Sequence, residues 1–156
     1  MASRDPWLTS CLCGMANLGF RPYTLGMKES LANNPSDAET ILVVEDDARS
    51  RKVVTSMLEA TGYRVVAAAD AIEALSAFAD TSLKIDIVLS DVKIPGMTGP
   101  DLVACLRSRR PGLRVLLMSG ATEGLTYNAP ILQKPFGMDD LHSGLAKTLS
   151  RLPAAS

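Results

Sequence analysis

The sequence predicts an α/β fold in which helices cover both faces of a doubly wound, five-stranded parallel sheet. Short continuous apolar runs recur between residues 40 and 133, and such runs are typical of strands buried on both faces of a parallel sheet. Segments with apolar residues at helical spacing separate these runs. Strands that alternate with helices form a parallel sheet, and right-handed crossovers wind it in both directions.

The first expected strand is the run ILVV at 41–44. The segment ARSRKVVTSMLEATG follows it with helical spacing, and Gly62 is the expected C-terminal stop of this helix. The second strand is expected at 64–69, and Asp70 is a suitable N-cap for the next helix. The expected apolar faces comprise Val54, Met57, Leu58 and Thr61 in the first helix, and Ile72, Leu75 and Ala79 in the second.

Three further strands are expected at 85–91, 114–119 and 131–133. A loop with Pro95 and Gly96 follows the first of them and leads into a helix at about 100–109. A last helix is expected at 138–152, because leucines recur there every three or four residues and Pro153 ends the pattern. The residues expected to face inward are Leu102, Cys105 and Leu106 in the third helix, and Leu141, Leu145, Leu149 and Leu152 in the last.

The composition indicates one globular domain with no charge signal for a large anionic partner. The chain has 156 residues, 47 % of them hydrophobic, and a formal net charge of −1, so we expect neither nucleic acid nor a membrane as a partner. No apolar run approaches the roughly 18–20 residues of a spanning helix, and the N-terminus lacks the apolar stretch of a signal peptide. Three cysteines in no disulfide or metal pattern, Cys11, Cys13 and Cys105, favour a cytoplasmic location.

Residues 1–38 differ in pattern from the remainder of the chain. Glycines and prolines punctuate them, NNPSDAE has the composition of a polar linker, and the apolar residues follow neither strand nor helix spacing. We therefore expect a disordered or poorly structured extension at 1–38, a domain at 39–152 and a short tail at 153–156. Met27 is an alternative start of the protein.

Polar residues end or directly follow four of the expected strands, which is where ligand-binding sites lie in such a sheet. Glu45, Asp46 and Asp47 follow the first strand, Asp91 ends the third, Ser119 ends the fourth and Lys134 follows the fifth. Ligands of doubly wound sheets bind outside the carboxyl ends of the strands, so we expect these side chains to converge. Crowded carboxylates need a cation, and oxygen ligands favour Mg²⁺. Phosphoryl transfer is the reaction class that uses carboxylates, a metal, a hydroxyl and a lysine together.

The segments ILVVEDD, IDIVLSDVKIPGMTGPDL, RVLLMSG and ILQKPF, taken in order, resemble the receiver domain of two-component response regulators. The resemblance covers about residues 40–152, and it is strongest to receivers attached to hybrid sensor histidine kinases. It implies the strand order 2-1-3-4-5 and a signalling domain that is not an enzyme, although it phosphorylates itself with Mg²⁺ and slowly dephosphorylates itself. The implied partner is a histidine kinase or a histidine phosphotransfer protein.

The resemblance also implies a role for individual residues. Asp91 corresponds to the phosphoacceptor, and Ser119 and Lys134 to the hydroxyl and the lysine that contact the phosphoryl group. The Lys134–Pro135 bond is expected to be cis. Asp47 remains open between a site residue and the start of the first helix, and His142 is expected on the surface. The implied magnesium ligands are Asp46, Asp91, Glu45, the last through water, and the backbone carbonyl of Lys93.

The interval between Ser119 and Lys134 departs from the family pattern. The segment GATEGLTYNAP holds two glycines, an asparagine and a proline, so we expect a shortened or missing fourth helix there. Ile131 stands where many receivers have an aromatic switch residue. Only PAAS follows the last helix, so we expect output by partner docking or by phosphorelay, from a stand-alone receiver or a detached piece.

Other functions use a similar sheet. The principal alternative is a pseudo-receiver, a protein-interaction module that keeps the fold without being phosphorylated. A flavin-binding protein needs a Ser-, Thr- and Gly-rich phosphate loop after the first strand, where acids stand instead. An aspartyl-phosphate hydrolase needs a second aspartate two residues after its nucleophile, and that position is Lys93.

Overall fold

A computed structural model describes residues 38–121 and 127–150 of the protein. The strands of these residues are β1 (Thr40–Val44), β2 (Arg64–Ala68), β3 (Ile87–Asp91), β4 (Lys93–Ile94), β5 (Met97–Thr98), β6 (Arg114–Ser119) and β7 (Ile131–Gln133). The helices are α1 (Ala48–Ala60), α2 (Ala71–Ala79), α3 (Gly99–Arg109) and α4 (Met138–Ser150). Five strands form one parallel sheet in the order β2-β1-β3-β6-β7, which confirms the predicted fold and strand order.

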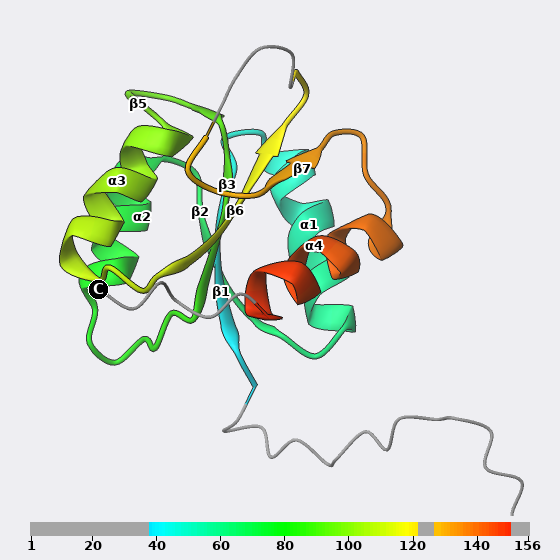
Figure 1. Cartoon of the computed structure of the whole chain (residues 1–156), viewed down its shortest axis with the longest axis horizontal. Helices are drawn as coiled ribbons and strands as arrows, with labels where there is room; N and C mark the ends of the chain where they lie inside the picture. Colours follow the sequence, from blue (N-terminus) through cyan, green and yellow to red (C-terminus); the bar gives the residue numbers. More distant parts are fainter. Residues whose placement is uncertain (1–37, 122–126, 151–156) are drawn as a thin grey trace, which may run out of the picture. The chain divides into compact units, whose positions relative to one another are not determined.

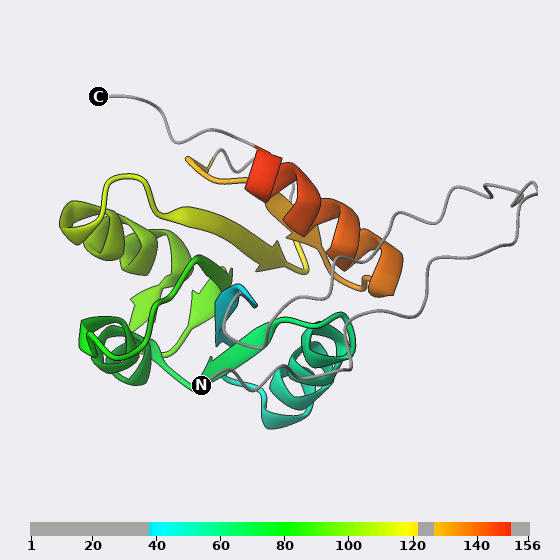
Figure 2. The same cartoon turned by 90° about the horizontal axis from the view of Figure 1, so that it is seen from below.

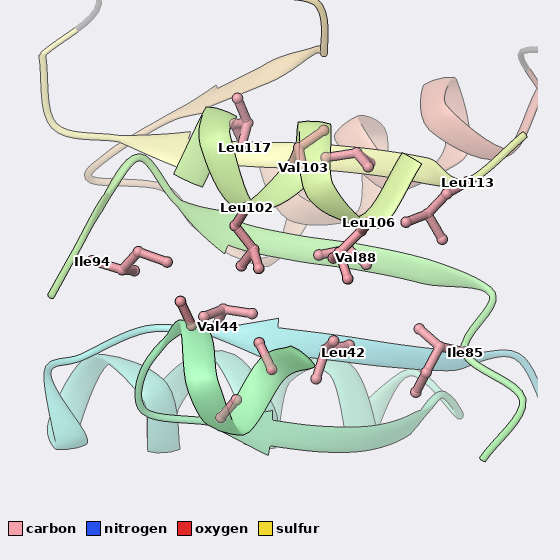
Figure 3. Packing of buried hydrophobic residues seen from close by; sticks show 14 of the residues in the cluster. Leu42, Val44, Ile85, Val88, Ile94, Leu102, Val103, Leu106, Leu113 and Leu117 are labelled. Carbon is pink, nitrogen blue, oxygen red and sulfur yellow. The ribbon is translucent and has the colours of Figure 1, made fainter. Parts of the chain in front are cut away.

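Helices cover both faces of this sheet and enclose two separate hydrophobic cores. Figure 1 shows α2 and α3 on one face and α1 and α4 on the other, and Figure 2 shows the same layers after a quarter turn. The strands alternate their side chains between the two cores, so Leu42 and Val44 belong to one and Ile41 and Val43 to the other. Figure 3 shows the first core, in which Leu102 and Leu106 of α3 pack against the sheet.

Three helices begin where a polar side chain caps a free backbone N–H group. The side chain of Asp47 accepts from the N–H of Ser50 at the start of α1, and that of Asp70 accepts from the N–H of Glu73 at the start of α2. Thr98 caps α3 in the same way. The predicted N-cap at Asp70 is therefore confirmed, and Asp47 begins the first helix, which was one of the two roles left open for it.

The predicted inward face of the second helix is wrong at two of its three positions, since only Leu75 packs, partly buried, against the core. Ile72 of α2 is 79 % exposed and Ala79 is exposed, whereas Ala71 and Ala74 are buried. Their small side chains allow α2 to approach the sheet closely, and the partly buried Phe78 fills the space beside them.

Three other sequence expectations need smaller corrections. Cys105 of α3 is only partly buried, and Val103 takes a buried position instead. In α1, Val54 and Leu58 are buried, but Thr61 is exposed and forms the C-cap. Strands β2 and β3 are shorter than expected, although Ile85, which precedes β3, is fully buried.

The expected loop around Pro95 contains a short antiparallel pair, β4 and β5. Pro95 and Gly96 form its turn, and Gly96 has a φ of +78° that suits glycine. Between β6 and β7, residues 120–121 and 127–130 contain no helix, and the rest of that segment lies outside the described residues.

The extension expected at 1–38, except for its last residue, and the chain after Ser150 also lie outside the described residues, so those expectations remain predictions. None of the helices in the described ranges combines the length and apolar character needed to cross a membrane.

Candidate functional site

The register of the parallel strands brings together residues that are far apart in sequence. Val44 of β1 lies opposite Ser90 of β3, so Glu45 and Asp91, each one position further on, lie side by side. Ser119 of β6 lies opposite Gln133 of β7, and Lys134 comes next. The N–H of Lys134 donates to the carbonyl of Ser119 at 2.8 Å, which extends the ladder by one residue. The site therefore lies at the carboxyl edge of the sheet, as predicted for its residue types.

Lys134 is shared between two carboxylates. Its Nζ lies 2.5 Å from Oε2 of Glu45 and 2.6 Å from Oδ2 of Asp91. The side chain of Glu45 is 2 % exposed and that of Asp91 is 14 % exposed, while the lysine is 25 % exposed. Burial removes water that would screen these charges, so one ammonium group offsets part of the repulsion between two neighbouring acids.

The surroundings raise the pKa of both Glu45 and Lys134. Burial raises the pKa of Glu45 above its usual 4.5, because the hydrogen bond and charge of Lys134 oppose this rise only in part, and the charges of Asp91 and Asp46 add to it. Burial lowers the pKa of Lys134, but hydrogen bonds to Asp91 and Glu45 and their charges outweigh burial and raise it above 10.5. Both pKa values can rise because two acids stabilise the charged form of Lys134, whereas the charged form of Glu45 is stabilised by one lysine that it shares with Asp91.

Three carboxylates could hold a cation together. One oxygen each from Glu45, Asp46 and Asp91 lies within 4.8 Å of the other two. In an octahedral magnesium site, oxygens on opposite sides of the ion are about 4.2 Å apart and neighbouring ones about 3.0 Å apart, from Mg–O distances of about 2.1 Å, so the three carboxylates would have to move closer together, or one of them would have to bind through water. A set of hard oxygen donors without sulfur or imidazole fits Mg²⁺ by its chemistry.

Asp46 and Asp91 differ in how their carboxylates are engaged. Both oxygens of Asp91 accept hydrogen bonds, Oδ1 from the backbone N–H of Lys93 at 3.0 Å and Oδ2 from Lys134. Asp46 is exposed, and no hydrogen bond or ion pair of its carboxylate occurs among the described residues. The side chain of Lys93 is exposed, and it is its backbone N–H group that contacts Asp91.

Ser119 lies at the same edge but its hydroxyl is directed elsewhere. Its Oγ donates to the carbonyl of Ala121 at 2.7 Å and accepts from the N–H of Ala121 at 3.2 Å. This buried hydroxyl thus stabilises the start of the segment after β6. The Lys134–Pro135 bond is cis, and Ile131 packs partly buried against the core that contains α3. His142 is exposed on α4, where the sequence placed it.

Arg51 carried no signal that the sequence analysis used, and Gly99 entered it only within the segment IDIVLSDVKIPGMTGPDL of the family resemblance. Arg51 of α1 donates to the carbonyls of Glu45 and Asp46. Gly99 of α3 lies so close to the strand end that an added Cβ would be 2.2 Å from the carbonyl oxygen of Asp91. An arginine in the first turn of a helix, where the helix dipole disfavours it, is a signal that could have identified Arg51.

Comparison with known proteins identifies this arrangement. The response regulator receiver domain family matches residues 41–146 of the chain. The chain is 33 % identical over 131 residues to sensor kinase CckA of Brucella abortus (strain 2308), which covers 80 % of this chain and 14 % of that protein. It is 30 % identical over 122 residues to sporulation initiation phosphotransferase F of Bacillus subtilis (strain 168), which covers 71 % of this chain and 94 % of that protein.

Solved structures agree with these sequence matches. The receiver domain from hybrid histidine kinase CckA superimposes with a TM-score of 0.62 at 34 % identity, over 71 % of this chain and 99 % of that one. Response regulator protein TrrA of Thermotoga maritima, solved in complex with Mg(2+)-BeF, gives a TM-score of 0.64 at 25 % identity, over 70 % of this chain and 98 % of that one. The predicted similarity to receivers of hybrid kinases is confirmed.

Proposed function

Because this chain belongs to the response regulator receiver family of two-component signalling, we propose that Asp91 accepts a phosphoryl group in a magnesium-dependent reaction. The observation that carries this proposal is the cluster of Glu45, Asp46 and Asp91 carboxylates within 4.8 Å, with Lys134 bonded to Asp91. A site with this composition has the groups that phosphoryl transfer requires.

Each residue has a proposed role. Asp46, Asp91 and the backbone carbonyl of Lys93 would hold Mg²⁺ directly, and Glu45 would act through a water molecule. Bound there, the metal supplies positive charge against the phosphoryl oxygens. Lys134 would leave Asp91 to bind one of those oxygens, and Ser119 would turn from Ala121 to donate to another.

The transfer itself is a substitution at phosphorus. A carboxylate oxygen of Asp91 forms the new P–O bond, and the P–N bond of a phosphohistidine donor breaks. The electron pair of that bond stays on the imidazole nitrogen of the donor. The N–H of Lys93, which donates to Oδ1 of Asp91 at 3.0 Å, would hold the carboxylate so that its orientation is fixed before the attack.

The proposed donor is a histidine kinase or a histidine phosphotransfer protein in the cytoplasm. The match over 94 % of sporulation initiation phosphotransferase F supports a receiver that works without an attached domain, while the match to 14 % of CckA supports a piece of a larger kinase. Output would follow by docking to a protein partner or by passing on the phosphoryl group.

Incubation of the full chain with acetyl phosphate and Mg²⁺ tests the proposal. Intact mass spectrometry should show one added phosphoryl group that hydroxylamine removes, and EDTA should prevent its formation. Asp91→Asn should remain unmodified. Asp47→Asn is the matched control, since Asp47 caps α1 and asparagine caps a helix equally well. A wild-type protein that stays unmodified would favour the pseudo-receiver.

A further inference from the structure

Arg51 connects the start of α1 to the two acids that precede it. Its Nη1 donates to the carbonyl oxygen of Glu45 at 2.6 Å and to that of Asp46 at 3.1 Å. Its backbone N–H donates to the carbonyl of Asp47 at 2.9 Å. The side chain therefore binds two successive carbonyl groups of the acidic segment, and the backbone bond is the first i→i−4 bond of α1.

The stability of α1 does not explain an arginine at this position. The first turn of α1 contains no acid and includes both Arg49 and Arg51. The partial positive charge of a helix N-terminus disfavours cations there. The first turns of the other described helices do carry acids, which are Glu73 in α2, Asp101 in α3, and Asp139 and Asp140 in α4. The contacts of the Arg51 guanidinium are the compensation that the structure shows.

These contacts fix the backbone from which two of the three clustered carboxylates extend. A peptide unit is planar, so holding its carbonyl oxygen limits the dihedral angles of the residues on either side. Only one residue separates Asp46 from the capped start of α1 at Ala48, and Asp46 is exposed. Without Arg51, the carbonyls of Glu45 and Asp46 would have no side chain to orient them among the hydrogen bonds of the described residues.

We propose that Arg51 is a positioning residue, which holds Glu45 and Asp46 in the arrangement that binds Mg²⁺. This inference rests on the proposed function. Replacing a positioning Arg51 should change the affinity for Mg²⁺ in the opposite direction from that expected for the loss of its charge alone. A cation near a metal site repels the metal, so removal of charge alone would strengthen Mg²⁺ binding. Loss of positioning would weaken it, and groups that orient metal ligands typically contribute about 10- to 100-fold in affinity.

Titration of Mg²⁺ into the full, unphosphorylated chain, followed by amide NMR spectra, separates these effects. Arg51→Met keeps the stem but removes the donors, and we expect its affinity for Mg²⁺ to fall about tenfold. Arg51→Lys should recover part of the loss, because one ammonium group can donate to both carbonyls. Arg49→Met is the matched control, since it removes the same charge from the same turn. Its affinity should equal or exceed that of the wild type.

The same spectra report whether each variant is folded, through amides of β3 and α3. If Arg51→Met does not fold, Arg51→Gln replaces it with the same expectation. A folded variant that binds Mg²⁺ as well as or better than the wild type overturns the proposal, and so does an Arg51→Lys variant as weak as Arg51→Met. A wild type that binds no Mg²⁺ would overturn the proposed function together with this inference, whereas failure confined to Arg51 would overturn only the inference.

Discussion

Gly99 limits what the site tolerates because α3 begins directly against the strand that carries Asp91. An added Cβ would lie 2.2 Å from the carbonyl oxygen of Asp91 and 3.0 Å from Cα of Val92. The N–H of Gly99 also donates to the carbonyl of Val92 at 2.8 Å. Both neighbours are backbone atoms, so they cannot rotate out of the way as a side chain would.

Gly99→Ala should therefore displace the backbone of Asp91. We expect a loss of about 1–3 kcal/mol in the free energy of unfolding, and slower phosphorylation by acetyl phosphate in the fraction that remains folded. Urea unfolding and mass spectrometry measure the two effects. Gly137→Ala is the control, because its added Cβ would meet nothing closer than a carboxylate oxygen of Asp140 at 3.8 Å. Equal behaviour of the two variants would contradict this explanation.

The acids of the site differ in what their removal should do to stability. Asp46 has no cationic partner among the described side chains, whereas Asp91 and Glu45 share Lys134. In EDTA, Asp46→Asn should stabilise the protein by about 0.5–1 kcal/mol, since it relieves repulsion at a functional site. Asp91→Asn should not, because it leaves Lys134 with one partner fewer.

Thermal unfolding in EDTA and in Mg²⁺ tests this difference. Magnesium should raise the melting temperature of the wild type, because a ligand that binds only the folded state stabilises it. It should have little effect on Asp46→Asn. If Asp46→Asn is less stable than the wild type in EDTA, the carboxylates of the site do not repel one another as inferred.

At the scale of elements, α1 and the segment before α4 form an apolar surface next to Asp91. A groove of about 500 Å³ is lined by Arg49, Ser50, Val53, Val54, Met57, Lys134, Pro135 and Phe136. Val53 is 56 % exposed and the nearby Met138 is 38 % exposed. Since Lys134 belongs both to this groove and to the site, a protein that delivers a phosphoryl group to Asp91 would cover the groove.

Val53→Glu should therefore slow phosphorylation by a protein donor and leave phosphorylation by acetyl phosphate unchanged. We expect at least about a tenfold decrease with a histidine phosphotransfer protein that phosphorylates the wild type, the effect of losing about 1.4 kcal/mol at an interface. Ile72→Glu is the control, because Ile72 is equally apolar and 79 % exposed but lies on α2, on the opposite face of the sheet. A Val53→Glu variant that accepts phosphate at the wild-type rate from both donors would exclude this surface.

For the whole molecule, the raised pKa of Glu45 links stability to pH. In EDTA the folded protein holds a proton on Glu45 at pH values where the unfolded chain has released it. The contribution of Glu45 to stability therefore increases as the pH falls through its folded pKa towards 4.5. Asp47 and Asp80 act in the opposite direction, but their pKa values lie below the usual 3.8. The pH range in which Glu45 affects stability therefore lies above that in which Asp47 and Asp80 do.

Urea unfolding of the wild type and of Glu45→Gln at several pH values in EDTA measures this contribution. The difference between the two free energies of unfolding should be constant at high pH and should shift in favour of the wild type as the pH approaches 4.5 from above. Saturating Mg²⁺ should abolish the shift, since the metal favours the ionised carboxylate. A difference that does not change with pH, or that shifts against the wild type, would show that Glu45 remains ionised.

Most elements of the fold could be predicted because their signals are local. The run ILVV, the N-cap at Asp70 and the Pro95–Gly96 turn each depend on neighbours in sequence. The inward face of α2 could not be predicted this way, since Ile72 and Ala74 are both apolar and the packing of α2 against the sheet decides which is buried. The residues proposed for the site came from their order along the chain and from the family resemblance.

The sequence by itself thus determined which residue types stand at the strand ends, and the order in which they occur. Only the tertiary structure decided how they meet. Lys134 lies 89 residues from Glu45 and 43 from Asp91 in sequence, and strand register places its ammonium group between both carboxylates. Among the described side chains Asp46 has no cationic partner, and the packing of α3 places Gly99 against Asp91. These contacts join separate elements, and no periodicity within one element can encode a distance between two.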